Sequence, residues 1–317
     1  MTAITPWHWA GFILFVLLSV AVDLRAFHRQ ARVITVREAA LWSVAWVALA
    51  VLFAALLSRW RGAEESTEFV TGYVLELSLS LDNILVIVLI FSAFRVPPEY
   101  QRRVLVWGVL GALTMRGLMI GAGVALVQRF EWVLYAFGIF LLGTGGKMLF
   151  ARPAPIEPEK KLVVRLARRF FPISPAFDGP NFTARVNGAL LLTPLALVLL
   201  LVEVSDVIFA MDSVPAVFAV TRKAFIVFTS NVFAVLGLRS MYFLMAGAIG
   251  KFRYLRAGLA VVLVFVGVKM LADPHDHPPQ WFQCEIPTQV SLLIITSILV
   301  TAIGLSVARA GALKEKR

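Results

Sequence analysis

Two short stretches of the sequence decide the fold. They read L-E-L-S-L-S-L-D-N-I at residues 75–84 and S-D-V-I-F-A-M-D-S-V at residues 205–214. Each contains an acidic residue, five intervening residues, a second acidic residue and then a small polar residue. Both lie inside apolar runs that exceed the roughly 20 residues a helix needs to cross a bilayer. The sequence therefore predicts a membrane protein that carries paired acidic side chains within its spans.

The composition of the 317 residues excludes a soluble protein. Hydrophobic residues make up 60% of the chain and charged residues 15%, whereas soluble domains have about 45–50% and about 25%. The net charge of +11 comes from basic residues in the gaps between apolar runs, so membrane topology explains it better than a nucleic-acid partner. The single cysteine, Cys284, excludes an intramolecular disulfide, a thiolate zinc site and an iron–sulfur cluster. The sequence shows no nucleotide-binding loop, and we expect no organic cofactor.

Nine apolar runs predict an all-α, polytopic membrane fold. They cover residues 7–26, 39–58, 69–93, 103–127, 131–149, 190–218, 224–247, 254–272 and 288–307. The gaps between them alternate in side. Of the 30 Lys and Arg residues, 22 lie in one set of gaps or within three residues of it, while 5 lie in the other. Because cytoplasmic loops carry the excess of basic residues, we expect the N-terminus outside and the C-terminus in the cytoplasm.

Three motifs recur in the same order and predict an internal repeat. The acidic pair at 75–84 returns at 205–214, L-T-M-R-G-L-M at 113–119 returns as L-G-L-R-S-M-Y at 236–242, and G-G-K-M-L at 145–149 returns as G-V-K-M-L at 267–271. Each copy holds three spans, and three is odd. The second copy is therefore expected to enter the membrane from the opposite side, as in the inverted repeats of many secondary transporters.

The repeat divides the chain into five parts. These are two peripheral spans at 1–68, the first three-helix copy at 69–149, a basic cytoplasmic linker at 150–189, the second copy at 190–272, and an external loop, last span and tail at 273–317. In the linker, basic and apolar residues alternate over 160–171, which predicts either a short helix on the anionic inner leaflet or a solvated segment.

The spans contain more acidic than basic side chains. A charge at mid-bilayer costs about 2.5–3.5 kcal/mol on insertion scales, so these groups need partners. The acids are Glu76, Asp82, Glu203, Asp206 and Asp212, and the deep bases are Arg116 and Arg239. Two arginines can neutralise two acids, and the others need protons or a cation. The competing hypothesis is structural, with every acid bound to an arginine or a helix end.

The neighbours of these acids are oxygen donors. Asn83 and Ser213 follow the second acid of each motif, and Ser78, Ser80 and Ser205 lie close by. No His or Cys residue lies in these spans. Such a set suits Mg²⁺, Ca²⁺ or Mn²⁺ rather than Zn²⁺ or Cu⁺. Lys147 and Lys269 lie near span ends and are expected to reach the interface.

Helix geometry limits how the acids can share one site. Glu203 and Asp206 lie on one face of a helix. The two acids of each motif, such as Glu76 and Asp82, are six residues apart and therefore about 120° apart around a straight helix. One site can use both only if the helix is broken, as Pro215 would allow in the second copy. Otherwise the second acid must face a different neighbour.

At these residues the sequence resembles the TerC family of bacterial integral membrane proteins, and most closely its Alx-type members. The resemblance covers nearly the whole chain and is carried by E-L-S-L-S-L-D-N at 76–83, R-R-V-L-V-W-G-V-L-G-A at 102–112, E-V-S-D-V-I-F-A-M-D-S-V-P-A at 203–216 and F-T-S-N-V-F-A-V-L-G-L-R-S-M-Y-F-L at 228–244. Family members are associated with manganese export and tellurite resistance, and some with supplying metal to secreted enzymes. The resemblance implies Mn²⁺ efflux, where charge counting implied only a hard cation or protons.

We therefore expect a transporter of the bacterial inner membrane and not an enzyme. The path is expected to use Glu76, Asp82, Asn83, Glu203, Asp206, Asp212 and Ser213, with Arg116 and Arg239 holding carboxylates or filling the path when the ion is absent. The expected substrate is Mn²⁺, with Ca²⁺ or Mg²⁺ as alternatives. Moving two charges outward against about 100 mV costs about 4.6 kcal/mol, which inward proton movement would offset.

Two points stay open beside transport: a scaffold function, and the role of the external loop. A membrane scaffold for maturing secreted proteins would bind partners, which the sequence does not identify, without metal flux. In the external loop, D-P-H-D-H at 273–277 offers His275 and His277 either as metal ligands or as part of a solvated turn.

The orientation is tested by labelling the two ends of the chain. A reporter fused after Arg317 should read as cytoplasmic and a tag placed before Trp7 as external, because of the uneven distribution of basic residues. Finding both ends on one side would contradict nine spans.

Overall fold

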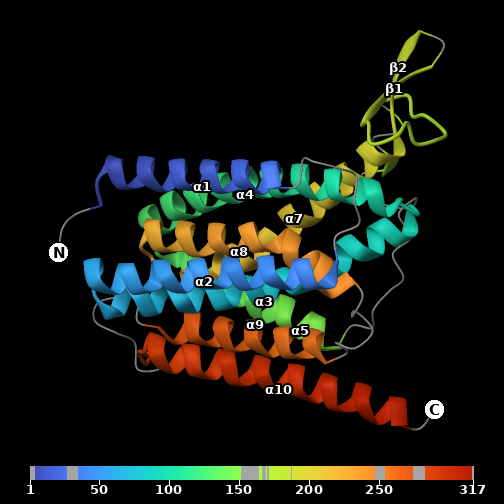
Figure 1. Ribbon diagram of the computed structural model, residues 1–317. Coiled ribbons are helices and arrows are strands. Elements are labelled where there is room, and N and C mark those ends of the chain that lie inside the picture. The colour runs from blue at the N-terminus through green and yellow to red at the C-terminus, as the bar shows by residue number, and fades with distance from the viewer. Residues whose placement is uncertain are drawn as a thin grey trace.

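The protein is a bundle of long helices. The computed structural model describes residues 4–26, 35–150, 164–165, 169, 171–186, 188–246, 254–273 and 283–315. Within these ranges the helices are α1 (Pro6–Ala26), α2 (Val36–Arg61), α3 (Ala63–Ala93), α4 (Pro98–Arg129), α5 (Trp132–Phe150), α7 (Pro194–Phe218), α8 (Ala224–Ala246), α9 (Leu255–Ala272) and α10 (Thr288–Glu315) (Figure 1). Each predicted span coincides with one of them.

The helices make the chain an integral, multi-pass membrane protein. Over the described ranges, eight helices, α2 to α5 and α7 to α10, are long and apolar enough to cross a bilayer. The apolar part of α1, Pro6–Val22, is shorter, so the ninth span stays a prediction. The predicted all-α, polytopic fold is confirmed.

Local sequence signals set several helix boundaries. The Thr35 side chain accepts a hydrogen bond from the Glu38 N–H and caps α2. Pro98 stands at the start of α4, where its missing N–H costs nothing. Gly62, with φ 101°, is the sole residue between α2 and α3. This tight corner starts α3 six residues before the predicted span and brings the acidic segment 64–68 into the helix.

Corresponding helices of the two predicted copies run antiparallel. Thr221, just after α7, donates a hydrogen bond of 2.8 Å to Glu68 near the start of α3. Tyr242, near the end of α8, donates one of 3.0 Å to Gln101 near the start of α4. An inverted repeat requires these directions. The repeat itself, as a two-fold relation between the copies, stays a prediction.

A small hairpin precedes α7 and modifies the predicted linker. Strands β1 (Thr183–Val186) and β2 (Ala189–Leu192) pair antiparallel, and Gly188 has φ 81°. The hairpin stands outside the bundle (Figure 1). The sequence N-G at 187–188 is a common hairpin turn signal, and β2 delays the helix of the second copy from 190 to 194. The segment 160–171 lies largely outside the described residues.

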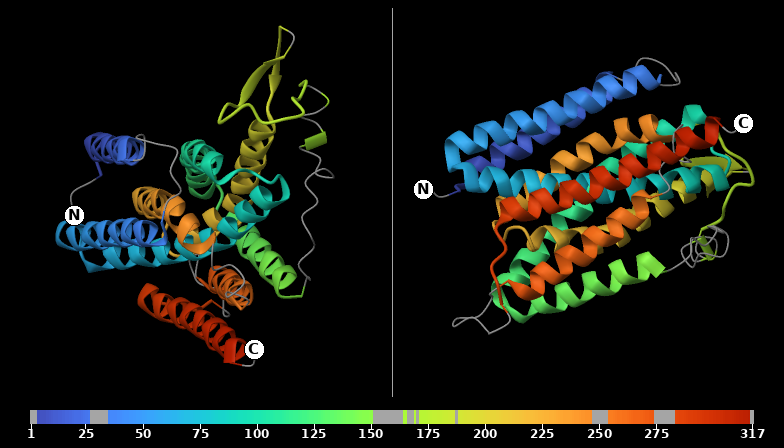
Figure 2. Two further views of the ribbon diagram at one scale, coloured as in Figure 1. Left: turned by 45° about the vertical axis from the view of Figure 1, so that its right-hand side comes forward. Right: turned by 90° about the horizontal axis from the view of Figure 1, so that it is seen from below.

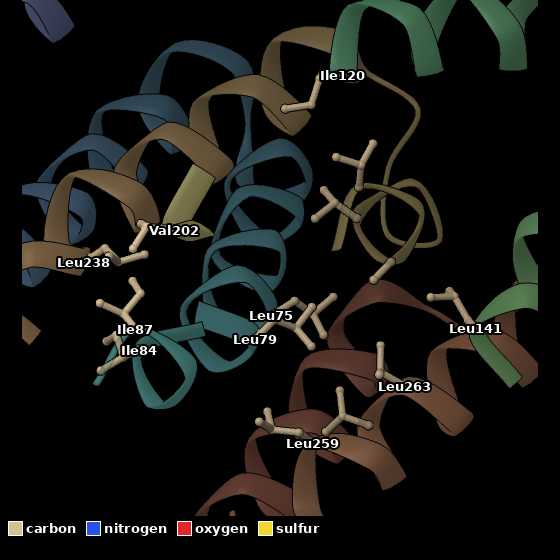
Figure 3. Close-up of a cluster of buried hydrophobic side chains, with 14 of the residues drawn as sticks. Leu75, Leu79, Ile84, Ile87, Ile120, Leu141, Val202, Leu238, Leu259 and Leu263 are labelled. Carbon is tan, nitrogen blue, oxygen red and sulfur yellow. The ribbon is translucent and has the colours of Figure 1, made fainter. Parts of the chain in front are cut away.

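The apolar core lies between the two predicted copies. Leu75 and Ile84 of α3, Leu141 of α5 and Leu259 of α9 are fully buried in one cluster (Figure 3). Helix α3 packs on α7 and α8, and α4 packs on the same two helices. Helices α1, α2 and α10 lie toward the edges of the bundle (Figure 2). The acidic motifs of α3 and α7 therefore lie on central helices.

Small residues bring α5 and α9 into close contact. A Cβ atom on Gly267 would lie 3.0 Å from the Gly138 carbonyl oxygen and 3.0 Å from the Leu142 amide nitrogen. A Cβ atom on Gly145 would lie 2.9 Å from the Ala260 carbonyl oxygen. Backbone atoms cannot yield as a flexible side chain can, so these glycines set the separation of the two helices.

Replacing Gly267 should therefore destabilise the bundle. We expect Gly267→Ala to cost about 1–3 kcal/mol through overpacking, measured as a lower unfolding temperature of the detergent-solubilised protein. Gly143→Ala on α5 is the matched control, because a Cβ atom there meets nothing within 4 Å. Equal unfolding temperatures for the two variants would contradict the close contact.

Candidate cation site

A buried arginine joins the two acidic motifs. Arg116 of α4 places Nη1 2.5 Å from Glu76 Oε2 on α3 and Nη2 3.3 Å from Asp206 Oδ1 on α7. Arg116 is 3% exposed, Glu76 0% and Asp206 4%. The first acids of the two motifs, 130 residues apart, are thus held together by one guanidinium. The expectation that Arg116 holds carboxylates matches this geometry.

Two asparagine amides complete the network. Asn83 Nδ2 donates to Asp206 Oδ1 at 2.9 Å, and Asn231 Nδ2 of α8 donates to Glu76 Oε1 at 2.5 Å. The Asn231 oxygen in turn accepts from Arg116 Nη1 at 3.2 Å. Each carboxylate therefore has one amide and one guanidinium donor, which is the arrangement that makes a buried charge tolerable.

Three oxygen atoms of the two acidic motifs are left without a partner. Among the described residues, Ser80 Oγ, Asn83 Oδ1 and Ser213 Oγ are buried and accept or donate no hydrogen bond. Ser80 and Asn83 follow Glu76 by four and seven residues, and Ser213 follows Asp206 by seven. These spacings put each oxygen on the helix face of its carboxylate. A buried unpartnered polar atom costs about 1–3 kcal/mol. Asn83 is held against Asp206 by its amide nitrogen, so its free oxygen indicates a place for a ligand beside that carboxylate.

A small cavity opens next to Asn83 and Asp206. Its volume is about 10 Å³, and the rest of its lining is apolar or glycine. That volume holds about one water-sized atom. A desolvated cation fits this space better than an organic ligand does.

The second acids of the motifs face other neighbours. Asp82 and Asp212 are half-buried and interact electrostatically with each other. Asp82 also interacts with Arg256 of α9, and Asp212 with the Thr144 hydroxyl of α5. Helices α3 and α7 run unbroken past these acids, and α7 continues through Pro215 to Phe218. The second acid of each motif therefore faces a different neighbour on an unbroken helix, and the helix break that the sequence allowed does not occur.

Glu203 lies on α7 and contacts α4. Its carboxylate oxygens occupy the place where a Cβ atom of Gly111 would be, at 2.1 Å. It also interacts electrostatically with Asp206. The glycine therefore lets the carboxylate rest against the backbone of α4.

Two other basic residues are buried. Arg239 of α8 is 3% exposed, and its pairing with a carboxylate of the path stays a prediction. Lys269 of α9 is 4% exposed and interacts with Glu68, Asp273 and Glu285. Helix α9 is covered by α5 and α10, so Lys269 is buried in the protein; its position at the membrane interface stays a prediction. Lys147, by contrast, is exposed.

A charged cluster at the start of α3 was not anticipated from the sequence. Lys223 Nζ lies 3.1 Å from Glu68, 3.6 Å from Glu65 and 3.9 Å from Glu64. Arg61 pairs with Glu65 at 2.8 Å. These three acids are paired with Lys223 and Arg61 and lie away from the Arg116 network.

Asn231 is the site residue that sequence reasoning overlooked. It belongs to the run at 228–244, but it was given no role there. The available signal was an amide side chain inside an apolar span, which is unfavourable in hydrocarbon unless it has partners.

Two further observations limit the metal chemistry. In the part of the chain that the structure describes, no three His, Cys, Asp or Glu side chains form a ready metal cluster. A cation would thus combine carboxylates with neutral oxygens. His275 and His277 lie outside the described residues.

Removing the central guanidinium should leave two carboxylates uncompensated. We expect Arg116→Met to cost about 3–5 kcal/mol, measured by thermal unfolding in detergent, and the added changes Glu76→Gln and Asp206→Asn to restore most of the loss. Arg129→Met is the control, since Arg129 is exposed at the end of α4 and contacts the Phe130 ring. A single variant as stable as the control would refute the network.

The sequence is similar to known membrane proteins along almost its whole length. The profile of the integral membrane protein TerC family matches residues 61–312. A membrane protein of Myxococcus xanthus named STKORF319 is 51% identical over 299 residues, which cover 94% of this chain and 91% of the relative. A protein of Escherichia coli K12 named Alx, which its name describes as a proposed membrane-bound redox modulator, is 46% identical over 305 residues. The match covers 93% of this chain and 92% of the relative.

A membrane protein of Rickettsia bellii is 33% identical over 301 residues, covering 95% of this chain and 97% of the relative. No solved structure matches the chain. The family match and the full-length relatives agree with the acidic motifs and the helical bundle, and the chain belongs to the integral membrane protein TerC family.

Proposed function

We propose that this protein exports a divalent cation, with Mn²⁺ as the preferred substrate, across the bacterial inner membrane. The single observation that carries the proposal is the buried network in which Arg116 lies between Glu76 and Asp206 beside unpartnered oxygen atoms. A guanidinium is itself a cation. The site is therefore built to hold positive charge between two helices.

Charge balance indicates how the site would work. Two ionised carboxylates and one guanidinium carry a net charge of −1. If a divalent ion replaced the guanidinium, the ion and the carboxylates would sum to zero, whereas both cations together would repel each other in a low-dielectric interior. Arg116 and the ion would thus alternate. Because the arginine is tethered to α4, it returns when the ion leaves and reduces the charge of the two carboxylates from −2 to −1.

Asp82 and Asp212 would form a second station on the path. They lie on a different face of α3 and α7, and the two carboxylates interact with each other. Two nearby carboxylates are stable together when they share a proton or a cation. With two such sites, the ion can move from one to the other, and neither site has to bind it so tightly that it cannot leave.

The ligand set and the family supply the choice of metal. Carboxylate, amide and hydroxyl oxygens suit Mn²⁺, and they also suit Ca²⁺ or Mg²⁺. The chemistry of this site alone does not rank the three ions. The resemblance of the motifs to the TerC family favours Mn²⁺.

Direction and driving force follow from the membrane potential. Export of two positive charges against about 100 mV costs about 4.6 kcal/mol. Inward proton movement would supply this free energy, and the carboxylates of the second station are groups that could carry the proton. In this arrangement the N-terminus is outside and the C-terminus is in the cytoplasm.

The name of the enterobacterial relatives suggests another reading. With one cysteine, the chain cannot form an intramolecular dithiol couple, so an effect on redox state would act through the metal that it moves. A scaffold or metal-supply partner for secreted proteins is the alternative of a different class. It predicts bound proteins without metal flux.

The proposal is tested by removing the charge of the second station. Asp82→Asn and Asp212→Asn should each abolish protection of cells against excess Mn²⁺ and abolish Mn²⁺ uptake into inside-out vesicles, with and without an imposed pH gradient. Glu99→Gln is the control, because Glu99 is exposed at the start of α4. Normal uptake by both variants would place the path elsewhere, and uptake absent even from the wild type would favour the scaffold.

A second test leaves every charge in place. Gly111→Ala should slow Mn²⁺ uptake severalfold, because a Cβ atom there displaces the Glu203 carboxylate. Gly121→Ala on the same helix meets nothing within 4 Å and should transport normally. If the two variants transported alike, Glu203 would not belong to the path.

A further inference from the structure

A large apolar pocket lies between α1, α2 and α8, and no acidic residue lines it. Its volume is about 410 Å³ and its walls are almost wholly apolar. Aromatic side chains form much of the lining, and six of the lining residues are Trp7, His8, Phe12, Trp60, Phe225 and Phe233. The helices α1 and α2 that form two of its walls lie at the edge of the bundle (Figure 2). The pocket is thus open to the hydrocarbon of the membrane.

The length of the pocket matches one leaflet of a bilayer. Its lining on α2 extends from Leu49 to Trp60, which at 1.5 Å per residue is about 16 Å. Half of a hydrocarbon core is about 15 Å. A single acyl chain, entering from one leaflet, has this length and this chemistry.

The two ends of the pocket differ in polarity. Trp7, His8 and Trp60 lie where α1 begins and α2 ends, and the His8 and Trp60 rings lie 4.6 Å apart. Tryptophan is typical of the level of the lipid head groups. The opposite end is lined by Leu49, Phe15 and other apolar groups. This polarity fixes the direction of a bound lipid, with its head group at the tryptophans.

The polar end carries donors and positive charge. His8 Nδ1 accepts a hydrogen bond of 3.0 Å from the Thr5 backbone N–H, so the proton of the neutral ring is on Nε2, which is a donor. Arg59 is exposed on the last turn of α2 beside Trp60, and Arg222 is exposed just before α8. The acids that follow α2, Glu64, Glu65 and Glu68, lie beside Arg61 and Lys223. The charge here complements an anionic head group.

We infer that this pocket binds one acyl chain of an anionic phospholipid, with the phosphate near His8 and Arg59. Shape and head-group contacts distinguish the site from the bulk bilayer, because an apolar wall alone gives no preference for a chain already in hydrocarbon. The bound lipid would fill the gap between α1 and the rest of the bundle. The inference does not depend on metal transport.

Gly11 allows the pocket to be filled without disturbing its walls. It lines the pocket, and a Cβ atom there meets nothing within 4 Å. Gly304 of α10 has equally open space and lies outside the pocket. Gly11→Leu and Gly304→Leu are thus matched variants, one of which occupies the place of the chain.

The test is native mass spectrometry of the purified full-length protein with phosphatidylglycerol or phosphatidylcholine. The wild type should retain one phosphatidylglycerol in preference to phosphatidylcholine. Gly11→Leu should weaken that binding at least about tenfold, whereas Gly304→Leu should not. Arg59→Gln should reduce the preference for the anionic lipid, and Arg129→Gln, which changes a base elsewhere, should not.

Three results would overturn the inference or part of it. Equal lipid retention by the Gly11 and Gly304 variants would show that the pocket is not the binding site. A dimer mass that Gly11→Leu alone abolishes would make this groove a contact between two copies of the chain. An Arg59→Gln variant that keeps the full preference would refute the assignment of the head group.

Discussion

The rest of the structure depends on the ion pairs that the Arg116 guanidinium makes with Glu76 and Asp206. The guanidinium holds a carboxylate of α3 and a carboxylate of α7 at one point in the interior, and Asn83 and Asn231 supply the remaining donors. Without it, two acids would face each other in a region where charges cannot be solvated. Burying three charged side chains is costly, so the network is better explained by a functional role than by a contribution to stability.

That role is consistent with the unpartnered oxygens. Ser80, Asn83 and Ser213 leave oxygen atoms without hydrogen bonds on the same helix faces as the carboxylates. A core selected for stability alone would place apolar groups there. Oxygen atoms without hydrogen-bond partners agree with the proposed cation site, because an ion bound there would take them as ligands. The acids at the start of α3 also lie beside bases, Lys223 and Arg61, but the unpartnered oxygens belong to the two motifs.

Much of this was predictable because hydropathy and charge act locally along a chain. Each of the nine apolar runs coincides with a helix in the described ranges, since a span must satisfy its own backbone, and acids inside spans had to be functional or paired. What could not be predicted depends on which faces meet. Asn231 gains its role from Glu76, 155 residues away, and Lys269 is buried because α5 and α10 cover its helix.

Other differences arose from alternatives that the sequence itself left open. The six-residue spacing of the acids allowed either a broken helix or a second neighbour, and only the packing of α5 and α9 around Asp82 and Asp212 decides between them. The hairpin at 183–192 carried a local signal, N-G, that was masked by the basic, proline-containing linker around it. The start of α3 depended on a single glycine conformation.

The most direct measurement is a titration of the purified protein with Mn²⁺, in which free Mn²⁺ is followed by its electron paramagnetic resonance signal. If Arg116 and the ion compete for Glu76 and Asp206, Arg116→Met should bind Mn²⁺ at least about tenfold more tightly than the wild type, because the competing cation is gone. Unchanged or weaker binding by the variant would contradict the exchange of guanidinium for metal.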